Sequence, residues 1–177
     1  MPYDVLVVDP PWPIAKLTRK TRPKQVDMDY TVVDLDRIRQ FDVGQLASDS
    51  SWMFLWTIQK YLFESRAILE DWGFHYLLMM VWKKEYGRSS GMPLKGFRWN
   101  AEFIAVGHRG KADLWPSRPL IPAVFSAVNE GHSIKPQAFY DLIAPLGDRR
   151  IDLFARKPRE GWDVWGNEVE SDIEIEF

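Results

Sequence analysis

The chain of 177 residues contains no cysteine and only three histidines. The lack of cysteine excludes disulfides, thiolate zinc sites and a cysteine nucleophile. With so few histidines, we predict no metal site. No stretch approaches the roughly eighteen uninterrupted apolar residues of a membrane span, so we expect no membrane contact. The first strand is expected to begin near the N-terminus, which leaves no room for a signal peptide and favours a cytoplasmic protein.

Hydrophobic residues make up 46% of the chain and aromatic residues 14%, including nine tryptophans. This content supports one domain with a real core. A buried tryptophan needs a partner for its N–H, so we expect some of the nine to line a pocket or a contact surface. The net charge of −2 is unevenly spread, because the last residues are acidic. We predict a single domain over 1–168 and an acidic, disordered tail over 169–177.

The most informative motif is Asp9-Pro10-Pro11-Trp12, which directly follows the apolar run Val5–Val8. A short, continuous, β-branched run is typical of a buried parallel strand. The prolines end that strand because they donate no ladder hydrogen bond. The motif is therefore expected at the carboxyl end of a strand, where open α/β sheets bind ligands.

The chemistry of these four residues suits the amino group of a nucleobase, and we predict them to be catalytic. Asp9 offers a carboxylate, and Pro10 offers a carbonyl held outside the ladder by the geometry of Pro10-Pro11. Two acceptors on an exocyclic amine would draw its nitrogen toward an attacking form, while Trp12 offers a face for an extruded base. The alternative is a strand that ends in a Pro-Pro turn with a core tryptophan.

A basic segment follows within a predicted long loop, residues 13–29. Its cations are predicted to contact nucleic-acid phosphates, and the alternative is a solvated loop. They are Lys16, Arg19, Lys20, Arg22 and Lys24.

Strands and helices alternate along the rest of the chain, which predicts an α/β fold with a mainly parallel sheet. The expected helices cover 34–46, 59–72 and 136–146. The expected strands cover 3–8, 52–56, 74–82, 102–107, 124–128 and 150–155, with a short edge strand within 162–168.

Further candidate residues lie at predicted strand and helix ends. Asp152 and Arg156 could hold a zwitterionic or ribose-bearing cofactor. Considered without Arg156, Asp152 is more typical of a partly exposed strand residue. Asn167 and Glu168 could accept from ribose hydroxyls, or form an ordinary turn. Lys135 precedes a helix and could bind a carboxylate or phosphate.

Two further interpretations stay open around those residues. The stretch before the helix at 136 reads equally as a helix start with Ser133 as N-cap. Arg98 and Glu102 could contact substrate or orient the preceding loop, or they could form a surface ion pair of little energetic value.

These residues together resemble the family of S-adenosylmethionine-dependent adenine-N6 methyltransferases that includes the catalytic subunit of the eukaryotic messenger-RNA adenosine methyltransferase. The resemblance runs from Tyr3 to about Glu168. Its small bacterial, archaeal and phage members are generally thought to act on DNA. The matching segments, in order, are 9–12, Tyr30, 54–57, Trp82-Lys83, Arg98 with Glu102, 107–110, 132–136, 151–156 and 166–168.

The resemblance implies a Rossmann-like sheet with helices on both faces. It also implies a circularly permuted order, in which the catalytic motif precedes the cofactor strand. S-adenosylmethionine would be the methyl donor. Asp9 would hold the target amine near the donor, and Trp12 or Tyr30 would stack on the base. Donor contacts would come from Lys135, on its carboxylate, and from Asp152, Arg156, Asn167 and Glu168, on its ribose and adenine side.

The chain departs from the family pattern at two positions. Ala155 replaces a common glycine, which bears on how closely the backbone approaches the donor, and Glu168 replaces a glutamine. DNA is favoured over RNA as substrate. Cytosine-N4 transfer, or a catalytically inactive scaffold subunit that binds nucleic acid, would also be compatible with these motifs. Both a homodimer and a heterodimer with a specificity subunit are compatible with so small a domain.

Overall fold

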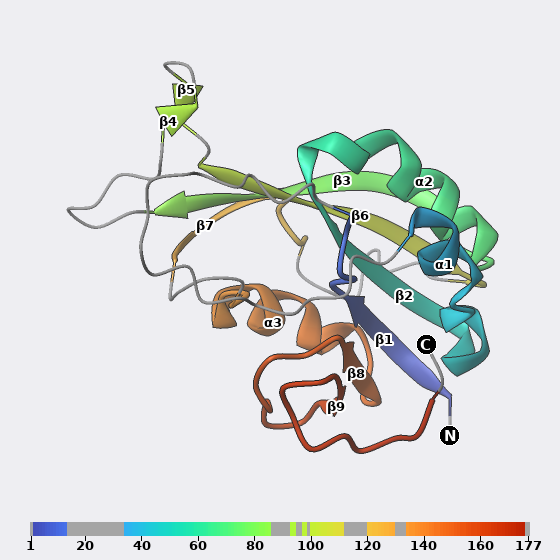
Figure 1. Ribbon diagram of the computed structural model, residues 1–177. Helices are drawn as coiled ribbons and strands as arrows, with labels where there is room; N and C mark the ends of the chain where they lie inside the picture. The colour runs from blue at the N-terminus through green and yellow to red at the C-terminus, as the bar shows by residue number, and fades with distance from the viewer. Residues whose placement is uncertain are drawn as a thin grey trace.

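A computed structural model of the chain describes residues 2–13, 34–85, 93–94, 97–98, 100–111, 120–129 and 134–175. Its centre is a seven-stranded sheet with the order β7-β3-β6-β2-β1-β8-β9 (Figure 1). Within this sheet β6 runs antiparallel to both of its neighbours, and the remaining pairs are parallel. The strands are β1 (Tyr3–Val8), β2 (Ala47–Thr57), β3 (His75–Glu85), β6 (Ala101–Arg109), β7 (Val124–Val128), β8 (Arg150–Leu153) and β9 (Asp163–Trp165).

Helices cover both faces of this sheet. Helices α1 (Leu35–Gln40) and α2 (Leu62–Asp71) pack on one face, and α3 (Gln137–Ile143) packs on the other (Figure 1). A small separate hairpin pairs β4 (Pro93–Leu94) with β5 (Phe97–Arg98). The predicted α/β, Rossmann-like and mainly parallel architecture is confirmed. None of the helices in the described ranges is long and apolar enough to cross a membrane.

Strand β1 is continuously apolar because both of its faces are covered. Leu6 and Val8 join the core beneath α1 and α2, whereas Val5 and Val7 join the core beneath α3. All four side chains are fully buried, because successive residues of a strand point to opposite faces and both faces are covered.

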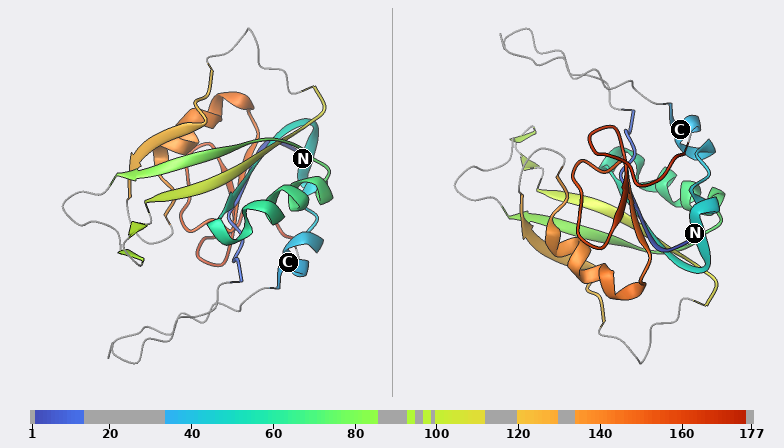
Figure 2. Two further views of the ribbon diagram at one scale, coloured as in Figure 1. Left: turned by 90° about the horizontal axis from the view of Figure 1, so that it is seen from above. Right: turned by 90° about the horizontal axis from the view of Figure 1, so that it is seen from below.

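The strand ends bring distant residues to one edge of the sheet. Val8 of β1 lies opposite Leu153 of β8 in parallel register, so Asp9 and Phe154 emerge side by side. Strand β6 runs the other way and therefore begins at this edge, where Glu102 lies opposite Trp82 near the end of β3. Figure 2 shows the strands in two further views, from above and from below the orientation of Figure 1. This edge collects polar residues from segments that are far apart in the sequence.

The predicted helix over 34–46 is wrong in its second half. Helix α1 ends at Gln40, and the chain then turns into a 3₁₀ segment, η1 (Val43–Leu46). Phe41 between them is extended, with φ −70° and ψ 92°, and it is buried. Its ring stacks on Trp165 at a centroid distance of 5.6 Å. A continuous helix is therefore interrupted by the burial of one aromatic side chain.

Two other helices begin or end in 3₁₀ turns. The segment predicted as a helix from Gln59 starts as η2 (Gln59–Tyr61) before α2, and the helix predicted to reach Leu146 ends as η3 (Ala144–Leu146) after α3. Gly73 follows α2 with φ +80°, a conformation that favours glycine, so it marks the helix end as predicted.

Residues 169–175 pack against the domain. Asp172 forms two hydrogen bonds with the backbone of Val164 in β9, and Ile173 and Ile175 pack against the core beneath α1 and α2. This packing differs from the disordered tail that the composition predicts. Asp172 accepts a hydrogen bond from the edge strand, and the two isoleucines after it supply apolar contact.

Candidate active site

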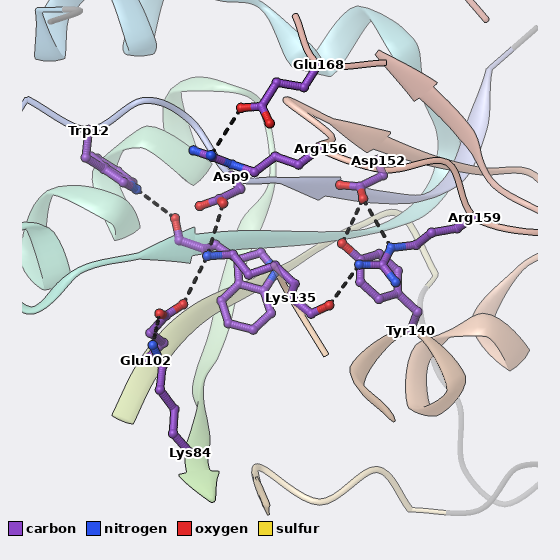
Figure 3. Close-up of polar contacts among 11 residues, drawn as sticks. Asp9, Trp12, Lys84, Glu102, Lys135, Tyr140, Asp152, Arg156, Arg159 and Glu168 are labelled. Atoms are coloured by element: carbon purple, nitrogen blue, oxygen red, sulfur yellow. Dashed lines mark hydrogen bonds and ion pairs between the residues drawn. The ribbon is translucent and has the colours of Figure 1, made fainter. Parts of the chain in front are cut away.

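The centre of the site is an ion pair between Asp9 and Lys135. Lys135 Nζ lies 3.0 Å from Asp9 Oδ2 and 3.0 Å from Glu102 Oε2, and Lys84 pairs with the other oxygen of Glu102. Figure 3 shows the resulting row of alternating charges, from Lys84 through Glu102 and Lys135 to Asp9. The Lys135 ammonium also lies over the Trp56 ring, 4.6 Å from its centroid. The Lys135 ammonium is thus enclosed by Asp9 after β1, Trp56 of β2 and Glu102 of β6.

Burial and charge pull the pKa values of these groups in different directions. Burial raises the pKa of Asp9; Lys135 opposes that shift and Glu102 adds to it. Burial would lower the pKa of Lys135, but Asp9 and Glu102 outweigh it, and the pKa is raised. The pKa of Glu102 is lowered, because Lys135 and Lys84 overcome the effect of its burial. Lys135 therefore stays protonated between two acids.

The Pro-Pro turn fixes the position of the motif. The backbone N–H of Trp12 donates to the Pro10 carbonyl at 2.8 Å, which closes a tight turn centred on Pro11. That carbonyl keeps its second lone pair for another donor. Asp9 itself is tied to β8, because its N–H donates to Leu153 O at 3.3 Å.

Trp12 acts as an anchor in this structure. It is 8% exposed, its Nε1–H donates to Trp56 O at 2.9 Å, and it stacks on Tyr61 with the centroids 5.2 Å apart. These contacts match the alternative of a core tryptophan after a Pro-Pro turn. A role for Trp12 in stacking on a base stays a prediction.

A second buried network lies beneath the site. Asp152 is 5% exposed and accepts a hydrogen bond of 2.7 Å from the Tyr140 hydroxyl. Arg159 lies over the Tyr140 ring, 3.5 Å from its centroid, and its Nε is 3.6 Å from Asp152 Oδ2. Arg159 also donates to the carbonyl of Lys135 at 2.9 Å and to Gln137 at 2.8 Å. Asp152 is thus a buried network member and not a partly exposed strand residue.

These groups line one pocket. It is bordered by Asp9, Lys135, Asp152, Phe154, Arg156 and Arg159, among others. The Nε of Arg159 is buried and has no hydrogen-bond partner among the residues that the structure describes. Burial raises the pKa of Asp152 to about 7, against the opposing effects of Tyr140 and Arg159.

The rim of the pocket is a closely packed turn. Phe154 adopts φ +63°, an unusual conformation for a residue with a side chain, and it directly precedes Ala155. A Cβ atom on Gly166 would lie 2.5 Å from the Ala155 carbonyl oxygen, so only glycine fits there. Beyond Gly166, Glu168 pairs with Arg156 at 3.1 Å, and Asn167 is exposed. In this structure the close backbone approach is the one between Gly166 and Ala155.

The structure thus brings Asp9, Glu102 and Lys135 together; Arg156 lines the same pocket, and Glu168 pairs with Arg156. Other predicted residues lie outside the described residues: Lys16, Arg19, Lys20, Arg22, Lys24, Tyr30 and Ser133. Arg98 belongs to β5, and its side chain is also outside the description. The N-cap of α3 is Pro136, not Ser133.

Sequence reasoning missed Lys84, Tyr140 and Arg159. One signal was available: an aspartate inside an apolar strand needs a donor when it is buried, and Tyr140 is a polar side chain on a helix with an apolar face. Nothing in the local sequence distinguished Lys84 from the exposed Lys83.

Comparisons with known proteins identify the family of the chain. A family model described as MT-A70 matches residues 3–168. The type II methyltransferase M.MunI of Mycoplasma sp is 29% identical, over 98% of this chain and 81% of its own length. The N6-methyladenosine RNA methyltransferase MTA1 of Cryphonectria parasitica is 28% identical, over 94% and 52%. The N(6)-adenine-specific methyltransferase METTL4 of Homo sapiens is 27% identical, over 94% and 37%.

The family match extends over nearly the whole domain, whereas the chain spans only about half of MTA1 and just over a third of METTL4. It includes every element of the pocket described above, from the strand of Asp9 to the turn of Glu168. The chain therefore belongs to the MT-A70 adenine-N6 methyltransferase family.

Proposed function

We propose that this protein transfers a methyl group from S-adenosylmethionine to the N6 amine of adenine in DNA. One observation carries the proposal: Asp9 leaves the end of β1 beside the Pro10 carbonyl and is held at 3.0 Å by the buried Lys135. Two acceptors on adjacent residues, the first of which lines the pocket, suit an amine with two hydrogens. Family membership supplies the reaction type.

The residues of the pocket fit the proposed methyl donor. Its amino-acid part carries one carboxylate and one ammonium, and Lys135 and Asp9 offer the complementary charges. The buried Arg159 Nε, at the same pocket, is a donor without a hydrogen-bond partner in the described part of the chain. At the rim, Asn167 and Glu168 offer oxygen acceptors for ribose hydroxyls. We assign Asp152 a supporting role, because Tyr140 already donates to it.

Asp9 and Pro10 act on the amine. The lone pair of an exocyclic amine is delocalised into the ring, which makes the nitrogen a poor nucleophile. When the Asp9 carboxylate and the free lone pair of the Pro10 carbonyl each accept one N–H, the nitrogen is turned toward a pyramidal form. Lys135 keeps Asp9 oriented, and positioning then supplies most of the rate. Asp9 need not be a strong base, because the proton can leave after the nitrogen has become cationic.

The donor, when bound, supplies an electrophilic methyl group on a sulfonium. The chain shields the charged groups of the site from much of the solvent, since the side chains of Lys135, Asp9 and Asp152 are 11%, 21% and 6% exposed. In such a setting fixed charges act more strongly than in water. We propose that Trp12 keeps the motif rigid and that Tyr30 is the better candidate for stacking on the base.

We favour DNA over RNA as the polymer. The type II methyltransferase matches this chain over 81% of its own length and the RNA methyltransferase over 52%, so the similarity extends over more of the former. The predicted phosphate contacts of the basic residues between Lys16 and Lys24 would suit either polymer.

An inactive scaffold subunit is the second candidate function. The intact ion pair at Asp9 disfavours it.

The decisive experiment supplies labelled S-adenosylmethionine with double-stranded DNA, single-stranded DNA and RNA in parallel, followed by nucleoside mass spectrometry. We expect N6-methyladenine in DNA. N6-methyladenine in RNA alone would move the proposal to the other polymer, and N4-methylcytosine would overturn the choice of base. No product and no donor binding in calorimetry would favour the scaffold subunit.

A further inference from the structure

The segment directly after the family match holds the pocket rim in place. The match ends at residue 168. From there the chain turns back beneath β9, as Figure 1 shows for the reddest part of the ribbon. Within this segment, Ser171 and Asp172 bond the backbone of β9 and of the rim turn.

Asp172 occupies the open edge of β9. Its carboxylate Oδ2 accepts from the Val164 N–H at 2.8 Å, and its own N–H donates to the Val164 carbonyl at 2.9 Å. On its other side β9 pairs in parallel with β8. An edge strand of three residues has few hydrogen bonds of its own, so these two contacts are a large share of what fixes it.

Ser171 extends the same support to the rim. Its hydroxyl accepts from the Gly166 N–H at 3.3 Å. Gly166 in turn packs directly on the backbone of Ala155, next to Phe154 in its unusual conformation. Any movement of Gly166 would therefore move the wall of the pocket and the Arg156–Glu168 pair beyond it.

We propose that Ser171 and Asp172 are positioning residues that set where Asn167 and Glu168 meet the ribose of the methyl donor. The inference rests on the proposed function, because it names the part of the donor that this turn contacts. The two isoleucines that follow anchor the segment on the core. Ser171 and Asp172 thus support the binding site from outside the region of the family match.

The test uses the full chain and two readouts. Calorimetry with S-adenosylhomocysteine measures affinity, and hydrogen exchange of the ligand-free protein measures protection at Val164 and Gly166. For Asp172→Ala we expect about fivefold weaker binding, the factor expected from the loss of one hydrogen bond. We also expect faster exchange at those two amides, a higher KM for the donor and an unchanged kcat. A purely structural role would lower the Tm and leave KM in place.

Matched variants separate the outcomes. Glu174→Ala removes an exposed acid from the same segment and should leave affinity and exchange unchanged. Asp172→Asn keeps an acceptor oxygen and should restore most of the affinity. If Asp172→Ala does not fold, Ser171→Ala makes the same test through Gly166.

Two negative results have different meanings. A wild-type protein that does not bind S-adenosylhomocysteine contradicts the proposed function, whereas the exchange data still report on the tail. Wild-type affinity and wild-type exchange in both Asp172→Ala and Ser171→Ala would overturn the positioning role alone.

Discussion

Asp9 and Lys135 meet at 3.0 Å although they lie far apart in the sequence. Strand β1 delivers the carboxylate, and the turn before α3 delivers the ammonium. Arg159 fixes that turn by donating to the Lys135 carbonyl. Contacts of both the side chains and the backbone therefore hold the pair in place, as expected of a pre-organised site.

Replacing Asp9 with alanine should separate catalysis from donor binding. The variant loses the charged acceptor for the amine, so we expect methyl transfer to fall by at least about a hundredfold. Affinity for S-adenosylhomocysteine should fall less, because Lys135 and the rim remain. Labelled methyl transfer and calorimetry give the two numbers. Asp49→Ala, at an exposed position of β2, is the control, and transfer by Asp9→Ala at the wild-type rate would contradict the proposed chemistry.

Replacing Lys135 with methionine should cost both stability and function. Two acids would be left near each other without their shared cation, and removal of one partner from a buried pair typically costs about 3–5 kcal/mol. Because Lys135 lowers the pKa of Asp9, its loss should raise that pKa further. The acidic limb of the pH–activity profile should then move to higher pH.

Lys83→Met is the matched control for that experiment, because Lys83 is an exposed lysine of β3. Urea unfolding and a pH–rate profile measure the two effects. A profile for Lys135→Met that superimposes on the wild-type profile would show that the ion pair does not control Asp9.

Asp152 should give the protein a distinctive dependence of stability on pH. Burial raises its pKa to about 7, above that of an unfolded aspartate. The folded state therefore keeps a proton that the unfolded chain releases, and this stabilisation is full below about pH 4 and lost as the pH rises to about 7. In Asp152→Asn this loss is absent. As the pH rises through that window, the free energy of unfolding of the variant minus that of the wild type should increase by up to about 1.4 kcal/mol per pH unit.

Urea unfolding of both proteins across this range makes the comparison, and taking the difference cancels the titrating groups that do not interact with Asp152. Asp4 is one such group with the opposite sign, since its pKa is lowered by Ser48 and Arg149 against the effect of burial. A constant difference at every pH would mean that Asp152 does not titrate in this range.

Arg109 should matter for stability but not for chemistry. Its guanidinium donates to three carbonyl oxygens, those of Gly44, Trp72 and Gly73, at 2.8 to 3.2 Å. It thereby joins the end of α2 to η1, on a part of the sheet remote from Asp9. Arg109→Ala leaves these carbonyls without their donor, and we expect a loss of about 2–3 kcal/mol in the free energy of unfolding.

The control for that variant is Arg66→Ala, which removes an exposed i,i+4 ion pair and should change stability by less than about 0.5 kcal/mol. Both variants should retain the kcat of the wild type. Arg109→Lys should recover little, because a lysine cannot reach three carbonyls at once.

The sequence predicted what is encoded in short, contiguous patterns. The apolar run of β1 and the prolines after it placed Asp9 correctly at the end of a parallel strand, because strand burial and proline geometry are local effects. The helix over 34–46 failed because Phe41 is buried against Trp165, a residue far along the chain. No helical periodicity reveals that contact.

The same limit applies inside the site. A buried Asp152 requires a donor, but only the packing of α3 beneath β8 decides that Tyr140 provides it. The sequence suggested that Glu102 contacts substrate or orients the loop, or else pairs with Arg98 at the surface, whereas the fold pairs it with Lys84 and Lys135. Charge partners depend on which strands become neighbours, and the strand order was not predicted.

The reversed direction of β6 bears on how such a domain diverges. Because β6 starts where β3 ends, both ends of their connection lie at the edge that carries Asp9, and the connections that follow β1 and β7 leave from the same edge. Asp9 and Lys135 lie within the first and last of these connections, close to the strand and helix that flank them. We expect insertions farther along the three connections to change target preference while the Asp9–Lys135 pair is kept.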